Sequence, residues 1–168
     1  MTPRDAVFLY LKHLRAMDRW IDKVRENAAL RKFDADVLIG ARLAPDQLPL
    51  SAQFQSACDS AKFGVAKLSG TEAPSHPDTE KTFDELRARL GVALSYVESF
   101  QDNAFAGWEE RRVSHSWMGA KWIAGSDYII QFAVPNFLFH VTTAYSILRH
   151  NGVPLGKSDF IAPISMQG

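Results

Sequence analysis

The sequence of 168 residues has little cysteine and no excess of charge of either sign. Cys58 is its one cysteine, which excludes an intrachain disulfide and any metal site built from several cysteines. Lys plus Arg number 19 and Asp plus Glu number 19, so the formal net charge is zero. Such a balance argues against non-specific binding to nucleic acid or to anionic membranes. Apolar residues make up 46% of the chain, and we expect a single globular domain over residues 1–168.

Residues 128–148 contain no Asp, Glu, Lys or Arg, so all the charged residues lie elsewhere. The length of this stretch would allow a membrane span. Gln131, Pro135 and His140 are among several polar or helix-disturbing residues in it, and we interpret it as a buried helix of a bundle. The amino terminus lacks the uninterrupted apolar core of a secretory signal, so we expect a cytoplasmic protein.

Apolar residues recur at helical spacing in four segments, which begin and end near residues 3–31, 50–68, 79–100 and 126–150. Asp78 or Thr79 is the expected cap of the third helix, and Pro135 is expected to kink or break the fourth. Residues 104–125 favour a small β-hairpin or an ordered long loop. Four amphipathic helices with one long connection predict an all-α four-helix bundle.

A few polar residues project onto the apolar faces of these helices. His140 lies near the middle of the apolar face of the last helix, and Asn136 lies one turn earlier at its edge. Residues at this spacing can share a ligand. On the second helix Gln53 flanks the apolar stripe, whereas Gln55 falls on the opposite face. The alternative is a core histidine whose hydrogen bonds are satisfied by Asn136, a backbone carbonyl or a buried water.

Other polar candidates have structural explanations. Asp18 projects among apolar residues of the first helix, and we interpret it as the partner of a basic neighbour on the same helix: Arg15, Lys23 or Arg25. Cys58 has no adjacent base and is interpreted as an inert buried thiol. Three further histidines are interpreted as surface or packing residues: His13, His76 and His115.

Three segments of the chain resemble a known family. They are PNFLFHVTTAYSILRHNGVPLGKSDF at residues 135–160, RLAPDQLPLSAQFQSACDSAK at 42–62, and SHPDTEKTFDELRARL at 75–90. Together they resemble an uncharacterised bacterial family within the DinB-like (DinB/YfiT) four-helix-bundle superfamily. The resemblance covers essentially the whole chain and implies a DinB-like bundle with a long connection between its third and fourth helices.

The resemblance also implies a position for a metal site. Many members of the superfamily bind a divalent metal through one histidine of the second helix and two histidines, at i and i+4, of the last. His140 matches the second of that pair, Asn136 replaces the first, and Gln53, or Gln55 as the alternative, replaces the histidine of the second helix. One imidazole and two amides are poor ligands for Zn²⁺ or Ni²⁺, so we expect a degenerate metal site.

The first functional hypothesis is a non-enzymatic protein that binds a small ligand around His140, Asn136 and Gln53 or forms a homodimer. The dimer is suggested by apolar residues off the core-facing stripe of the last helix, which need cover from a second subunit or from the long hairpin: Phe132, Leu138, Phe139 and Tyr145.

The second hypothesis is a divalent-metal-dependent enzyme, of the hydrolase or thiol S-transferase type. It would use a rearranged site anchored on His140 and completed by Asn136, Gln53 and Asp18. DNA binding is a third idea, suggested by the name of the superfamily alone, and the neutral charge and lack of a basic helix argue against it.

Overall fold

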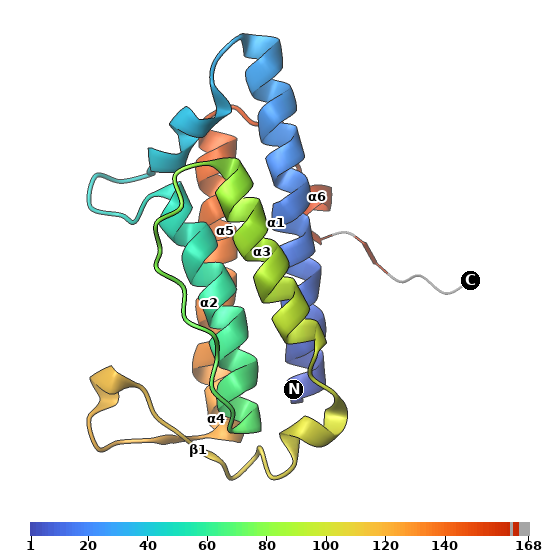
Figure 1. The fold of residues 1–168 in the computed structure, drawn as a ribbon, viewed down its shortest axis with the longest axis vertical. Coiled ribbons are helices and arrows are strands. Elements are labelled where there is room, and N and C mark those ends of the chain that lie inside the picture. The colour runs from blue at the N-terminus through green and yellow to red at the C-terminus, as the bar shows by residue number, and fades with distance from the viewer. Residues whose placement is uncertain (162, 165–168) are drawn as a thin grey trace.

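The structure is a computed structural model that describes residues 1–161, 163 and 164. Within these residues, four long helices run alongside one another, as Figure 1 shows: α1 (Pro3–Arg31), α2 (Leu50–Ser69), α3 (Phe83–Glu98) and α5 (Val134–His150). Helix α2 packs against both α5 and α3, and α1 packs against the other three. The predicted all-α bundle is therefore confirmed, and a short 3₁₀ helix, η1 (Ala35–Gly40), precedes α2.

Helix α1 begins and ends at residues that satisfy its terminal backbone groups. The hydroxyl of Thr2 accepts a hydrogen bond from the backbone of Asp5, whose carboxylate accepts one from the backbone of Thr2. Pro3 occupies the first turn, where its missing N–H costs nothing. At the other end Lys32 adopts a left-handed conformation with φ of 59° and terminates the helix.

Helix α3 begins at Phe83, later than the sequence predicts. Thr82 and Glu85 form a capping box in which each side chain binds the backbone of the other. The expected caps Asp78 and Thr79 are therefore wrong. Asp78 instead pairs with Arg89, because the chain before α3 runs as an extended loop across the bundle surface.

The connection between α3 and α5 contains the predicted hairpin, with two strands of two residues each. Its elements are η2 (Asp102–Phe105), β1 (Arg112–Val113), η3 (Ser116–Met118) and β2 (Ile123–Ala124), and β1 pairs antiparallel with β2. The base of the hairpin is fixed because the backbone N–H of Gly125 donates to the carbonyl of Arg111 at 2.9 Å. A Cβ atom at Gly125 would lie 1.9 Å from the carbonyl oxygen of Trp108, so this approach requires glycine.

Pro135 produces a π-helical turn rather than a break. The helical segment α4 (Gly125–Tyr128) continues through η4 (Ile129–Ala133), a π-helical turn, into α5. The backbone N–H of Val134 bonds to the carbonyl of Ile129, five residues earlier. Pro135 has no N–H to donate to Gln131, and the wider turn accommodates its ring.

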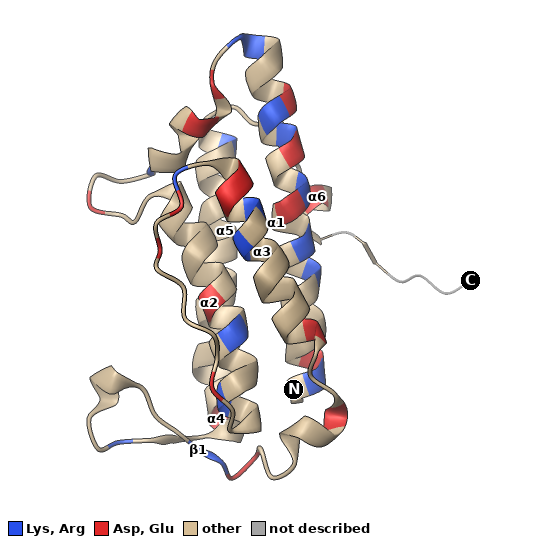
Figure 2. Cartoon of the chain, in the orientation of Figure 1, with Lys and Arg blue, Asp and Glu red and all other residues tan. Residues whose placement is uncertain are grey.

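The uncharged stretch 128–148 lies in the bundle. Phe137, Ala144 and Leu148 are fully buried there, and Figure 2 shows α5 almost free of charged residues. No helix in the described part of the chain has both the length and the apolar character needed to cross a membrane. This stretch is therefore part of a bundle helix with one buried face, while Ile130 and Phe139 on its other side are exposed.

Most of the apolar residues off the core-facing stripe of α5 are covered by the same chain. Phe132 packs against His115 of the hairpin, with ring centroids 4.9 Å apart. Tyr145 packs edge to face on Phe160 of the short helix α6 (Lys157–Ile161). Phe139 remains 58% exposed.

A buried cluster of charges, termed here the Lys62–Arg89 cluster, ties the loop 71–82 to α2 and α3. The side chains of Lys62 and Arg89 are 0% and 1% exposed, and each lies 2.9 Å from Asp59. Arg89 also pairs with two carboxylates of the loop, those of Asp78 and Glu80. Lys62 also donates to two groups of the loop, the carbonyl of Pro74 and the ring of His76. These contacts hold an otherwise irregular segment in place.

Candidate functional site

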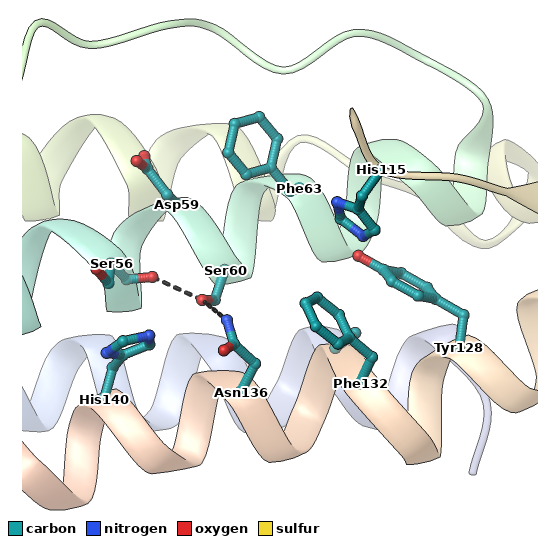
Figure 3. Close-up of a pocket in the computed structure, with 10 residues that line it drawn as sticks. Ser56, Asp59, Ser60, Phe63, His115, Tyr128, Phe132, Asn136 and His140 are labelled. Carbon is teal, nitrogen blue, oxygen red and sulfur yellow. Dashed lines mark hydrogen bonds between the residues drawn. The ribbon is translucent and has the colours of Figure 1, made fainter. Parts of the chain in front are cut away.

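A cavity of about 220 Å³ lies between α2 and the last helix, with the hairpin at one end (Figure 3). Its lining residues come from α2, the hairpin and the segment α4–η4–α5: Ser56, Asp59, Ser60, Phe63, His115, Tyr128, Phe132, Ala133, Asn136 and His140. A dry cavity of about 150 Å³ holds benzene, so this one has room for a single ring with a substituent.

Gln53 and His140 meet across the interface of α2 and α5. Nδ1 of His140 lies 2.8 Å from Oε1 of Gln53, and Nε2 of Gln53 donates to the carbonyl of Leu48 at 3.1 Å. The opposite amide orientation would place Oε1 against the Leu48 carbonyl, so Gln53 presents an acceptor to the histidine. Nδ1 of His140 therefore carries the proton. Gln55, the alternative considered from the sequence, instead donates to Glu80 away from this interface.

The second nitrogen of His140 is a free acceptor. Nε2 has no hydrogen-bond partner in residues 1–161, 163 and 164, and it is not sealed from the cavity. Burial lowers the pKa of His140, which keeps the ring neutral at pH 7. A neutral imidazole protonated at Nδ1 presents a lone pair at Nε2.

Asn136 has a partner of its own on α2. Its Nδ2 donates to Oγ of Ser60 at 2.7 Å, and that hydroxyl donates to the backbone carbonyl of Ser56 at 2.6 Å. Figure 3 shows this chain between His140 at one end of the cavity and the aromatic residues at the other. Asn136 and His140 thus line one cavity, while each is held by a different residue of α2.

The aromatic end of the cavity is formed by the hairpin and the start of the last helix. The rings of Tyr128 and Phe132 stack with centroids 5.8 Å apart, and His115 lies 5.6 Å from Tyr128. Nε2 of His115 is buried and has no hydrogen-bond partner among the described residues. Burial lowers the pKa of His115, so this ring is neutral as well. From the sequence His115 is interpreted as a surface or packing residue, because no helical spacing links the hairpin to the last helix.

Asp18 lies outside this cavity and pairs with α3. Nε of Arg87 donates to its carboxylate at 2.8 Å. The local partners predicted for it are wrong, because α3 packs on α1 and brings Arg87 to Asp18 from another helix. The predicted partners bind other carboxylates: Arg15 binds Glu98, Lys23 binds Asp159 and Arg25 binds Asp84.

The residues around the cavity do not fit a divalent metal. In the described residues no group of three or more His, Cys, Asp and Glu side chains is placed to hold one ion. Gln53 binds Nδ1 of His140, on the other side of the ring from Nε2, and so cannot complete a coordination sphere with Nε2. The lining also contains His115 and Asp59, but these two and His140 are not placed to hold one ion, and hydroxyl and amide oxygens are weak donors for Zn²⁺ or Ni²⁺.

Cys58 offers no nucleophile to the cavity. It is fully buried, and burial raises the pKa of its thiol to about 12. A thiol of such high pKa carries almost no thiolate at pH 7. The interpretation of Cys58 as an inert residue agrees with this environment.

Comparisons with known proteins agree with the fold. A crystal structure described as a DinB family member protein from Shewanella denitrificans is 40% identical to this chain, with a TM-score of 0.91. The alignment covers 100% of this chain and 99% of that one. The comparison with curated proteins finds no match. The family described as "Domain of unknown function (DUF1993)" matches residues 4–161. The chain therefore belongs to this uncharacterised, DinB-like family.

Proposed function

We propose that the protein binds a small organic molecule in the cavity between α2 and α5. One observation supports this most directly: two histidines with no partner at Nε2 among the described residues line the same cavity, His115, whose Nε2 is buried, and His140, whose Nε2 is accessible. Polar atoms in protein interiors are usually hydrogen-bonded. A ligand with a polar group can therefore find a hydrogen-bonding partner in this cavity.

Binding is better supported than catalysis because, among the residues that line the cavity, no nucleophile is hydrogen-bonded to a base. Ser60 is the hydroxyl at the centre of the cavity, but it donates to a backbone carbonyl and accepts from Asn136. Nucleophilic catalysis requires a hydrogen bond from the hydroxyl to its base, which His140 does not accept from Ser60.

A cavity-filling variant tests the proposal. Ala133 lines the cavity, and Ala133→Leu would fill it, whereas Ala52→Leu adds the same group to a half-exposed position of α2 that is not among the lining residues. We expect toluene to shift the NMR signals of cavity residues in the wild type and in Ala52→Leu, with no effect in Ala133→Leu. Equal shifts in all three proteins, or none in the wild type, would contradict the proposal.

The proposal includes the loss of the metal site, and a metal-dependent enzyme is the second candidate. Elemental analysis of protein purified without a histidine tag separates them. We expect zinc and nickel contents near zero, unchanged in His140→Ala. About one ion per chain, lost in His140→Ala, would support the metal-dependent enzyme instead.

A further inference from the structure

The hydrogen-bond direction, charge and shape of the cavity narrow the class of ligand. Resting on the proposed binding function, we propose that the ligand is a neutral ring compound that donates a hydrogen bond, from a hydroxyl or N–H group, to Nε2 of His140. The polar group lies at the His140 end of the cavity, and the ring lies toward Phe132 and Tyr128.

The direction of this hydrogen bond follows from a fixed relay. The carbonyl of Leu48 accepts from Nε2 of Gln53, so Oε1 of Gln53 must accept from Nδ1 of His140. Gln53 is 1% exposed, which leaves it no alternative partner in water. His140 therefore offers an acceptor, and its ligand must be a donor.

The charges around the cavity exclude ionic ligands. Asp59 is the one charged side chain in the lining, and its carboxylate is already held by Lys62 and Arg89, each 2.9 Å away. An anion would therefore find no cation in the lining and would face a carboxylate. An organic cation would have to compete with two buried cations for the same oxygen atoms.

The shape of the cavity suits a single ring. Phe132 packs with Tyr128 and His115 into an aromatic wall at one end (Figure 3), and Phe63 of α2 also lines the cavity. Aromatic side chains pack favourably against another ring in stacked or edge-to-face arrangements. The volume of about 220 Å³ admits one substituted ring.

Four ring compounds of similar size separate these requirements: phenol, a neutral donor; anisole, its analogue without the donor; benzoate, an anion; and benzylamine, a cation at pH 7. The experiment is an NMR titration of the full chain with each compound. We expect phenol to bind in the millimolar range and to shift the Nε2 resonance of His140. Anisole should bind about three- to tenfold more weakly, the usual effect of one neutral hydrogen bond, and the two ions should bind more weakly still.

A matched pair of variants tests the relay. Gln53→Met removes the acceptor for Nδ1 of His140 with little change of volume, and Gln55→Met makes the same change two residues along the helix, where the glutamine binds Glu80. We expect Gln53→Met to weaken phenol binding about three- to tenfold and to abolish the single Nδ1–H form of His140 in long-range proton–nitrogen spectra. Gln55→Met should change neither.

The outcomes distinguish the inference from the function on which it rests. If anisole binds as well as phenol, or if benzoate or benzylamine binds best, the ligand class is wrong while small-molecule binding stands. If none of the four compounds binds, the proposed function itself fails. Should Gln53→Met not fold, the order of the four compounds on the wild type still decides the ligand class.

Discussion

The buried ammonium group of Lys62 donates a hydrogen bond to Nδ1 of His76, fourteen residues further along the chain. The bond requires a neutral imidazole, since a protonated ring would present a second donor to the lysine. Burial, together with the positive charges of Lys62 and Arg89, lowers the pKa of His76. The attachment of the loop 71–82 to the bundle is therefore linked to pH.

The first prediction concerns stability at mildly acid pH. The pKa of His76 is lower in the folded chain than in the unfolded one, so the unfolded chain binds more protons below about pH 6.5 and stability falls as the pH falls. Three more histidines shift in the same direction: His13, His115 and His140. We expect the urea midpoint to decrease from about pH 7.5 to about pH 5.5, and less so in His76→Gln, which keeps an acceptor for Lys62 without titrating. Equal pH dependence of the two proteins would contradict this role of His76.

The second prediction compares two arginines of α3. The side chain of Arg89 is 1% exposed and pairs with three partly exposed carboxylates, so Arg89→Leu would remove their shared cation and lower the free energy of unfolding by up to about 3 kcal/mol. Arg87 binds Asp18 and Asp22 at the surface, and Arg87→Leu should cost about 1 kcal/mol or less. Urea unfolding measures both values. Similar losses in the two variants would show that burial of the Lys62–Arg89 cluster has no special importance.

The third prediction compares two glycines. Gly125→Ala would force the new methyl group against the carbonyl oxygen of Trp108, so we expect a loss of about 1–3 kcal/mol in the free energy of unfolding. Gly91→Ala meets nothing within 4 Å in the exposed part of α3 and should stabilise the protein by about 0.5–1 kcal/mol. Thermal unfolding of the two variants checks both signs, and a stable Gly125→Ala would show that the base of the hairpin can move.

The fourth prediction is the homodimer, whose support now rests mainly on Phe139. Intrachain contacts cover Phe132 and Tyr145, whereas Phe139 is 58% exposed. Light scattering should give a mass of twice 18.8 kDa at high protein concentration, and Phe139→Ser should shift it toward the monomer. A monomer at every concentration tested would rule out self-association through α5.

Helix positions could be predicted from the sequence because they depend on local spacing. The ends of α1 and α2 lie where Pro3, Lys32 and Gly70 allow a helix to begin or end. The start of α3 lies later than expected because several polar residues precede it, although the capping-box spacing of Thr82 and Glu85 is itself a local signal for the true start.

Part of the candidate site could also be predicted from helical spacing alone. The helical projection that turned Gln53 toward the core and Gln55 away from it agrees with their partners in the structure. Helical projection could not identify His115, because the residue lies in the hairpin and only the folding of the hairpin onto the last helix places it at the cavity. Asp18 was assigned neighbours on its own helix for the same reason: the approach of Arg87 is a property of helix packing.

The π-helical turn at Ile129–Ala133 determines how the two ends of the cavity are oriented relative to each other about the helix axis. Tyr128 precedes this turn and His140 follows it, so the wider turn sets the rotation of the aromatic wall relative to the histidine about the helix axis. Regular α-helical geometry over the same residues would turn Tyr128 with respect to His140 by close to the rotation of one residue, about 100°. The wider turn thus determines that the aromatic wall and the histidine face the same cavity.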